Sequence, residues 1–428
     1  SEKDLGRVPD EKGLSREDQK FLDLAAEKIM FSKGHYELPL PFREEQMTLE
    51  NNRVQAEKRA SWQLRKMQRN EKYHRDYVEF VEKLLQKGYA YPVQADQGLS
   101  SQQAWYLPHH GVYHPKKPEK IRVVFDCSAK WVGFSLNDKL IQGPDLTNSL
   151  VGVLTRFRQE KVALMGDIEA MFYQVKVPED QHKFLRFLWW PNGDLKQELR
   201  EYRMGVHIFG AVSSPSIANY VLRATADKAS DKFGQDVVKT IKDNFYVDDC
   251  LKSVSSDEEA IKLVSDLTEA LRDGGFKLTK FTSTSKAVLK SIPIDDRSKE
   301  AQACNLDYDE LQAERALGLK WNIEDDCFTF SAKLATKPLT RRGILSTISS
   351  LYDPLGFVAP FILPAKQMLR EVCQAKELDW DDDIPADFER PWKRWLQDLP
   401  LLENLAIPRC MKPKYFGAVT SSQLHMFS

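Results

Sequence analysis

The sequence predicts an α+β protein in which helices back an antiparallel sheet. Between residues 150 and 290, short apolar runs of strand length alternate with segments of helical periodicity, and a tight acidic turn joins two of the runs. Strands that alternate with helices around a central hairpin are typical of an α+β sheet with helices on one face. The length of 428 residues exceeds the size of one hydrophobic core, so we expect two to four subdomains.

The composition excludes several classes of protein. Hydrophobic residues make up 42% and charged residues 29%, which excludes a wholly disordered or collagen-like chain. The formal net charge is −1, so a nucleic-acid partner would have to meet a local basic surface. The six cysteines stand singly, which argues against a disulfide framework or a zinc site and favours a reducing compartment. No apolar run is long enough to span a membrane, and the charged start is no signal peptide.

The N-terminal part is expected to contain a lead-in segment followed by long helices. Because the chain begins at Ser1 without Met, we expect a fragment of a longer protein. A short helical pattern from Phe21 to Met30 is followed by a proline-containing stretch. Residues 48–87 contain no Gly or Pro and carry apolar residues at helical spacing, which predicts long helices that end at Gly88. Their many Lys and Arg residues are compatible with a solvated face or with a surface that faces nucleic acid.

The next elements are a basic hairpin and an alternation of helices and strands. Residues 104–130 form short β-like runs, and five Lys or Arg stand against two acids between His109 and Lys130. A helical pattern over 148–160 leads into the strand 162–168. Later, Ser214 followed by Pro215 predicts a helix start, because Ser can cap and Pro is preorganised at the first position.

The C-terminal half is expected to contain two hairpins and a helical subdomain. Residues 240–254 form two β runs around an acidic turn, and an amphipathic helix then opens at Ser256. A second hairpin is expected near residues 314–330, and helices are expected over Thr340–Tyr352 and 361–375. The tail from residue 378 predicts no clear element.

Two acidic positions indicate a site. Asp167 ends an apolar strand, while Asp248 and Asp249 lie at the apex of the acidic hairpin. If these strands are neighbours, three carboxylates converge, and such a cluster is unfavourable without cations such as Mg²⁺. Adjacent Asp residues on a regular strand would point to opposite faces, so a turn is needed for both to serve one site. An ordinary acidic hairpin turn is the alternative explanation.

The order of motifs resembles the reverse transcriptase of BEL/Pao-class long-terminal-repeat retrotransposons. The resemblance spans about residues 34–428 and rests on GHYELPLPFR, KIRVVFDCSAK, DIEAMFYQV, HIFGAVSSPSIAN, FYVDDCL, GGFKLTKF, LGLKWN and ISSLYDPLGFVAP. It implies the right-hand polymerase fold of fingers, palm and thumb. The implied domains are a lead-in (1–47), N-terminal helices and fingers (48–165), palm with residual fingers elements (166–290), primer-grip hairpin (291–335), helical thumb (336–377), and a connection with the truncated start of a ribonuclease H domain (378–428).

The resemblance also assigns roles to individual residues. Asp167, Asp248 and Asp249 match the metal-binding catalytic triad, and the backbone carbonyl of Ile168 is expected to join them around two Mg²⁺ or Mn²⁺ ions. Phe172 matches the gate that rejects a ribose 2′-hydroxyl, although ordinary core packing is the alternative. The remaining matches are Lys117 and Arg122 for the triphosphate, Gly210 for close approach of the nucleotide, Lys280 (with Lys277 as a rival) for protonation of pyrophosphate, and Gly318 and Trp321 for the primer grip. The sequence departs from the retroviral pattern at Phe209, where a glutamine is usual, and Trp321 could instead belong to the core.

The implied function is an RNA-directed and DNA-directed DNA polymerase of retrotransposon replication. Its partners would be an RNA or DNA template, a DNA or tRNA-type primer and dNTPs, inside the cell and possibly in virus-like particles; the oligomeric state stays open. The alternative is a domesticated or truncated copy that binds nucleic acid or a partner protein without catalysis. Because the chain stops at a stretch that resembles the opening strand of ribonuclease H, we expect polymerisation without RNA degradation and poor order from about Tyr415.

Overall fold

The computed structural model describes residues 13–44, 47, 49–94, 103–115, 117–331, 337–374 and 378–412. The residues from Tyr415 onward, whose order was at issue above, lie outside these ranges. The chain forms two compact units. The first unit comprises Ser1–Thr147, Ala170–Lys228 and Ala270–Phe276, and the second comprises Asn148–Glu169, Ala229–Glu269 and Lys277–Ser428. Residues 170–228 of the expected palm therefore lie in the first unit, and the boundaries of fingers, palm and thumb stay predictions.

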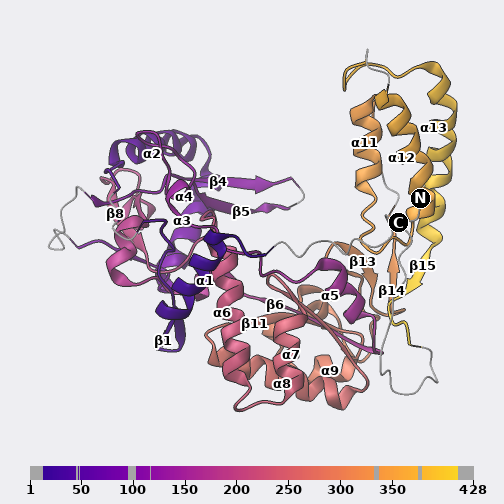
Figure 1. Cartoon of the computed structure of the whole chain (residues 1–428), viewed down its shortest axis with the longest axis horizontal. Helices are drawn as coiled ribbons and strands as arrows, with labels where there is room; N and C mark the ends of the chain where they lie inside the picture. Colours follow the sequence, from indigo (N-terminus) through magenta and orange to yellow (C-terminus); the bar gives the residue numbers. More distant parts are fainter. Residues whose placement is uncertain are drawn as a thin grey trace. The chain divides into compact units, whose positions relative to one another are not determined.

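Helices α2 and α3 of the first unit confirm the expectation for residues 48–87 (Figure 1). The helix α2 spans Arg53–Arg69 and α3 spans Glu71–Gln86. The side chain of Asn70 caps α3 by accepting a hydrogen bond from the backbone N–H of Tyr73. Gly88, at φ +66°, ends it in the left-handed conformation that favours glycine. The other helices of this unit are α1 (Arg16–Lys28), α4 (Leu136–Lys139) and most of α6 (Ser214–Ala229).

Three small antiparallel sheets complete the first unit. The expected basic hairpin is confirmed as β4 paired with β5, and a three-stranded sheet has the order β3-β8-β7. An apolar core that includes Tyr77 of α3, Phe125 of β5 and Trp189 of β7 holds these elements together. The strands are β1 (Met30–Ser32), β2 (His35–Glu37), β3 (Ala90–Pro92), β4 (His109–His114), β5 (Lys117–Phe125), β7 (Arg186–Trp189) and β8 (Arg200–Met204).

A four-stranded antiparallel sheet of order β11-β6-β10-β9 is the centre of the second unit. Its strands are β6 (Val162–Ile168), β9 (Phe245–Tyr246), β10 (Asp249–Val254) and β11 (Leu278–Ser283). The expected antiparallel sheet backed by helices is confirmed, but its cover is not limited to one face, because the neighbours Ala163 and Leu164, which point to opposite faces, are both buried. Ala163 packs with α5 (Leu150–Phe157), and Figure 1 shows α7 and α8 on the side of the sheet away from α5.

The acidic hairpin is shorter than the sequence predicts. The helix α7 (Gln235–Asp243) takes up the residues expected to begin the first β run, which leaves only two residues in β9. The amphipathic helix is confirmed as α8 (Asp257–Asp273). Two short helices, α9 (Lys286–Ser291) and α10 (Lys299–Ala303), follow β11.

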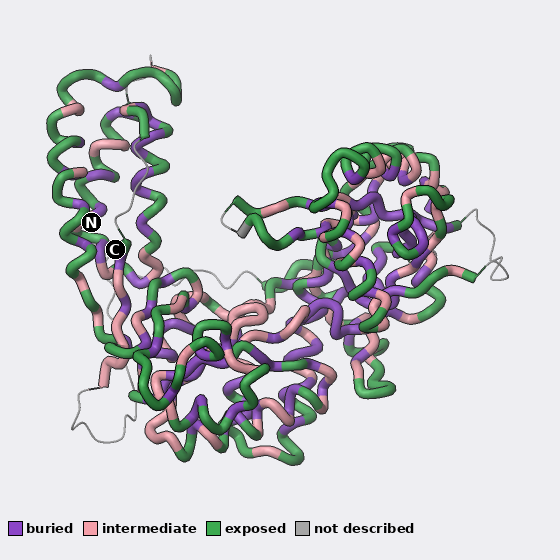
Figure 2. Tube along the Cα trace, turned by 180° about the vertical axis from the view of Figure 1, so that it is seen from behind, coloured by how far each residue is buried: buried purple, intermediate pink, exposed green. Residues whose placement is uncertain are grey.

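The C-terminal part combines a second sheet with a helical bundle. The sheet has the order β12-β13-β14-β15, with strands Glu314–Ala316, Leu319–Asn322, Cys327–Thr329 and Ala406–Pro408. The helices α11 (Arg341–Ser350), α12 (Ala359–Gln374) and α13 (Ala386–Asp398) lie between β14 and β15 in sequence and side by side in space, with their buried positions facing one another (Figures 1 and 2). The tail that predicted no clear element thus supplies α13 and β15. Among the described residues, none of the helices has the length and apolar character needed to cross a membrane.

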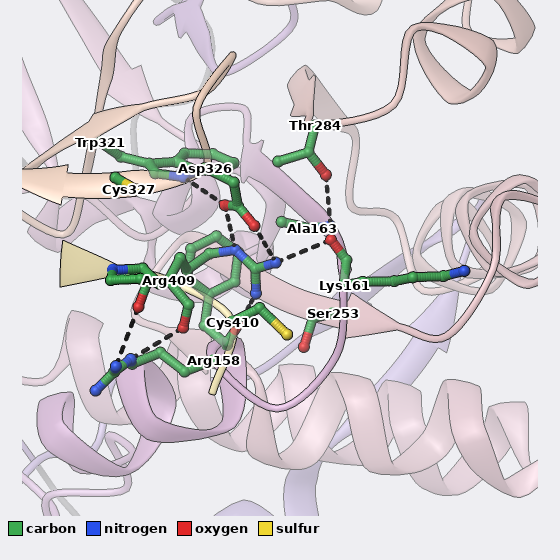
Figure 3. Close-up of polar contacts among 12 residues, drawn as sticks. Arg158, Lys161, Ala163, Ser253, Thr284, Trp321, Asp326, Cys327, Arg409 and Cys410 are labelled. Carbon is green, nitrogen blue, oxygen red and sulfur yellow. Dashed lines mark hydrogen bonds and ion pairs between the residues drawn. The ribbon is translucent and has the colours of Figure 1, made fainter. Parts of the chain in front are cut away.

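A buried arginine fastens β15 to the two sheets of the second unit (Figure 3). The fully buried guanidinium of Arg409 donates to both carboxylate oxygens of Asp326, at 2.7 and 2.8 Å. It also donates to the backbone carbonyls of Phe157, Glu160 and Lys161, which lead into β6. In return, Arg158 donates to the carbonyl of Arg409 at 3.0 Å. A buried charge is stable only when paired and hydrogen-bonded, and this one is.

Candidate functional site

The acidic hairpin places Asp248 in a tight turn between β9 and β10. Val247, which precedes it, has φ +57°, a left-handed conformation that is costly for a β-branched residue. The turn is tied to the end of β6, because the backbone N–H of Ile168 donates to the carbonyl of Asp248 at 2.9 Å. The backbone therefore holds Asp248 next to the last residues of β6.

Asp167 and Asp249 lie directly opposite each other on neighbouring strands. They are register partners in the antiparallel pair β6 and β10. Side chains at such positions share one face of the sheet, with Cβ atoms about 4.5–5.5 Å apart. On its other side Asp167 pairs with Thr279 of β11. The two strands are therefore neighbours, as expected, with Asp167 and Asp249 opposite each other and Asp248 at the adjoining turn.

Burial and mutual repulsion make the carboxylates of Asp248 and Asp249 hard to ionise. Burial raises the pKa of Asp248, and the nearby Asp167 raises it further. Burial, followed by repulsion from Asp248 and Asp167, raises the pKa of Asp249 to about 7. A cation at this position would favour the ionised carboxylates. The cluster therefore has the electrostatic character of a cation site.

Lys280 supplies one such cation. Its Nζ lies 2.5 Å from Oδ1 of Asp167. The residue has φ +55° and stands where the pairing of β11 with β6 is irregular between Thr279 and Thr282. The rival Lys277 lies further out, 3.7 Å from Glu169 and 3.6 Å from Asp296. Within the described ranges, no group of three His, Cys, Asp or Glu side chains stands ready to hold a metal ion, so the carboxylates do not form a closed ligand set here.

Two family models match the chain. Residues 115–288 match the reverse transcriptase (RNA-dependent DNA polymerase) family, and residues 340–428 match the Pao retrotransposon-like RNaseH-like domain. Together these matches support a Pao-class retrotransposon reverse transcriptase, as the order of motifs suggests. The described part of the second match contains the bundle α11–α13 and the strand β15.

Solved structures support a reverse-transcriptase fold for this chain. A foamy viral protease-reverse transcriptase dRH in complex with dsDNA aligns with a TM-score of 0.53 and 16% identity, over 91% of this chain. A second foamy viral protease-reverse transcriptase, also with dsDNA, aligns with a TM-score of 0.53 and 15% identity, over 94% of this chain and 71% of its own length. The chain spans 58% of the length of the first structure. No curated protein matches the chain.

In the first unit, the ring of Phe172 packs against the ring of Phe209. The ring centroids lie 4.4 Å apart, and Phe172 is 9% exposed, whereas Phe209 is 46% exposed. The ring of Phe172 is therefore largely packed, as the core interpretation expects, and its role as a gate stays a prediction. The neighbouring Tyr173 is buried against Tyr89. The departure at Phe209 therefore has a packing consequence, because an aromatic ring covers Phe172 where a glutamine is usual.

Position 210 requires glycine because the backbone of Phe125 passes close to it. Its φ is +109°, and a Cβ at this position would lie 2.3 Å from the carbonyl oxygen of Phe125. Asn137, which sequence reasoning missed, holds the segment by donating to the carbonyl of Gly210 at 2.9 Å and accepting from the N–H of Val212 at 3.0 Å. Nothing in the local sequence around Asn137 indicates this contact. The glycine thus has a structural reason that is independent of any nucleotide.

The residues proposed to contact the triphosphate and the primer differ in their exposure to solvent. Arg122 is exposed on β5, opposite Val112 of β4. Lys117 begins the same strand, but its side chain lies outside the described residues. Gly318, at φ +93°, forms the turn between β12 and β13, whereas Trp321 is fully buried and donates from Nε1 to Oδ1 of Asp326 at 3.0 Å. Of its two interpretations, the structure places Trp321 in the core, so direct contact with a primer is not available to it.

Proposed function

We propose that the chain is an RNA-directed and DNA-directed DNA polymerase of retrotransposon replication. In the reaction, the primer 3′-oxygen attacks the α-phosphorus of a dNTP, the bond to the β-phosphate oxygen breaks, and pyrophosphate leaves. The observation that carries the proposal is the register of Asp167 opposite Asp249, with Asp248 held at the adjoining turn. The reverse transcriptase family match over the same residues supports it.

The carboxylate cluster fits divalent cations. Oxygen ligands suit Mg²⁺. Burial, with repulsion from Asp248 and Asp167, raises the pKa of Asp249 to about 7, and a bound cation would counter that effect. Two ions held by Asp167, Asp248, Asp249 and the Ile168 carbonyl would lower the pKa of the primer hydroxyl and neutralise charge on the leaving pyrophosphate. The short contact with Lys280 supports the idea that the cluster accepts a cation. Lys280 is therefore proposed to donate a proton to the leaving pyrophosphate.

Other groups would orient the substrates. Arg122 and Lys117 would contact the triphosphate, where a guanidinium can bind two oxygens and an ammonium acts as a point charge. Phe172 would exclude a ribose 2′-hydroxyl, and the Gly318 turn would contact the primer end. The solved foamy viral enzymes were captured with dsDNA, which supports a primer-template duplex as the partner of this chain. We further propose that it acts inside the cell.

Primer extension tests the proposal. The full chain is incubated with poly(rA)/oligo(dT) and dTTP, with Mg²⁺ or Mn²⁺ and with excess EDTA as the control. We expect extension with either metal ion and none with EDTA. Binding of primer-template without any extension in either metal would contradict the proposal and favour the non-catalytic alternative.

A further inference from the structure

The solvent-facing side of α2 carries a row of cations around a tryptophan. The row, here called the basic stripe, consists of Lys58, Trp62, Arg65 and Arg69, and all four side chains are exposed. Their spacing of four, three and four residues places them on one face of the helix. At a rise of 1.5 Å per residue the stripe is roughly 16 Å long.

The three cations of the basic stripe are not used by the fold. Within the described ranges, Lys58, Arg65 and Arg69 make no hydrogen bond and no ion pair. The other cations of α2 do have partners, since Arg59 pairs with Asp126 at 3.0 Å and the Nζ of Lys66 lies 4.0 Å from the ring centroid of Tyr73. The free cations are thus concentrated on the outer face of the helix.

The neighbouring helix α3 has the surface that ordinary solubility requires. Its charges include both signs, and four of them form ion pairs one turn apart, Lys72 with Asp76 and Lys83 with Glu79. In contrast, α2 carries six Lys or Arg and a single Glu in a chain whose net charge is −1. The excess of positive charge on α2 is therefore local.

Trp62 makes the surface more specific than a basic patch. Its side chain is 61% exposed, and the guanidinium of Arg59 lies 6.0 Å from its ring centroid. An exposed aromatic ring between cations provides a platform on which an unpaired base can stack while phosphates meet the charges. A duplex would present its phosphates but would keep its bases stacked inside.

We propose that the basic stripe of α2 binds single-stranded nucleic acid, with Trp62 stacked on a base and the three cations on phosphates. This inference rests on the proposed function for its partner, because a polymerase template is single-stranded ahead of the primer. Of the two interpretations that the sequence leaves open for the Lys and Arg residues of this segment, a solvated face or a surface that faces nucleic acid, the inference favours the second for α2.

Binding of a fluorescein-labelled 20-nucleotide oligo(rU) to the full chain tests the inference. Affinity is measured by anisotropy at several salt concentrations. We expect the triple variant Lys58→Gln/Arg65→Gln/Arg69→Gln to reduce the slope of log K against log salt by about 2, because each phosphate contact on a single strand contributes about 0.7. We expect Trp62→Ala to weaken binding on the order of tenfold and Trp62→Phe to retain most of the affinity.

A matched variant separates the stripe from general charge effects. Lys239→Gln/Lys262→Gln/Lys290→Gln removes the same charge from exposed positions on α7, α8 and α9. It should bind oligo(rU) like wild type, and all variants should keep the wild-type melting temperature. Three outcomes would each overturn the inference. The matched variant could weaken oligo(rU) binding as much as the triple variant does, or Trp62→Ala could weaken binding of a blunt duplex as much as binding of oligo(rU). The triple variant could also lose binding to a poly-glutamate probe while its binding of oligo(rU) is unchanged.

The outcomes also distinguish this inference from the proposed function. If the wild-type chain binds oligo(rU) through the basic stripe but extends no primer, the inference is supported and the proposed polymerase function is contradicted. If the chain extends primers but its triple variant binds oligo(rU) like wild type, the polymerase function is supported and the inference is contradicted.

Discussion

The ammonium group of Lys280 lies 2.5 Å from a carboxylate oxygen of Asp167, and it joins two residues that are 113 positions apart in the chain. The contact depends on the left-handed backbone of Lys280 at the irregular pairing of β11. It places a proton donor beside the cluster proposed to hold the metal ions. Lys277, three residues earlier, reaches only acids outside this cluster.

Replacement of Lys280 should slow nucleotide addition far more than replacement of Lys277. A positioned general acid contributes at least about 10²-fold, so we expect Lys280→Ala to lower the rate of single-nucleotide incorporation by that order. Lys277→Ala is the matched control and should stay within about threefold of wild type. Rapid-quench incorporation of one dTTP measures both variants, and equal losses would show that Lys280 has no special role.

Phe172→Val should relax the choice of sugar. The smaller side chain removes the proposed barrier to a ribose 2′-hydroxyl, so the ratio of kcat/KM for dTTP over UTP should fall at least about tenfold, a loss of about 1.4 kcal/mol in discrimination. Phe172→Tyr keeps the ring and should retain the ratio. If the ratio is unchanged in Phe172→Val, the ring that packs on Phe209 serves the core alone.

Two buried histidines should make the first unit sensitive to acid. Burial lowers the pKa of His109 and of His207 to about 4. Each donates from Nε2 to a backbone carbonyl, that of Leu188 and that of Leu38 respectively. The unfolded chain binds a proton near pH 6.5 and the folded chain only near pH 4, so the stability they contribute is present above pH 6.5 and is lost as the pH falls toward 4.

Urea unfolding at pH 7.5, 6 and 5 measures this acid sensitivity. We expect the free energy of unfolding to fall with pH in wild type and to fall less in His109→Gln and in His207→Gln. The control His74→Gln, at a half-buried position on α3, should keep the wild-type dependence. Identical pH dependence in wild type and in both buried-site variants would contradict the prediction.

The buried pair of Arg409 and Asp326 should contribute far more stability than an exposed pair. Removing one partner of a buried ion pair costs about 3–5 kcal/mol, so Arg409→Met should destabilise the second unit by that order. The added change Asp326→Asn should recover part of the loss, as a double-mutant cycle would show. The control pair Arg342 with Asp381 is exposed, so Arg342→Met should lower the free energy of unfolding far less than Arg409→Met does. Urea unfolding measures the loss in the free energy of unfolding for each variant. Equal losses for Arg409→Met and Arg342→Met would contradict the prediction that the buried network stabilises the fold.

Local chemistry explains why the carboxylate cluster could be predicted from the sequence. An apolar run before Asp167 and a tight turn at Asp248 are visible within a few residues, and a shared sheet brings them together. Helices α2 and α3 were equally accessible, since Gly and Pro are absent between residues 48 and 87.

Long-range contacts explain what could not be predicted. Arg409 meets Asp326 from 83 positions away and the carbonyl of Phe157 from 252 positions away, and no local pattern records such partners. The role of Asn137 beside Gly210 depends on a contact across 73 positions. For Trp321, the periodicity of the sequence is compatible with a core position and with a primer contact. Its complete burial in the structure distinguishes the two.

The most direct test of the central claim is single-nucleotide incorporation by Asp249→Asn at saturating Mg²⁺ and dTTP. The change removes one ligand charge at nearly constant volume, opposite Asp167 in the sheet. The account predicts a loss of about 10³-fold or more in rate, because the metal ions supply several kcal/mol of transition-state stabilisation. The variant should keep the wild-type melting temperature, and the exposed control Asp231→Asn should incorporate like wild type. Incorporation by Asp249→Asn within tenfold of wild type would contradict the assignment of the cluster as the polymerase active site.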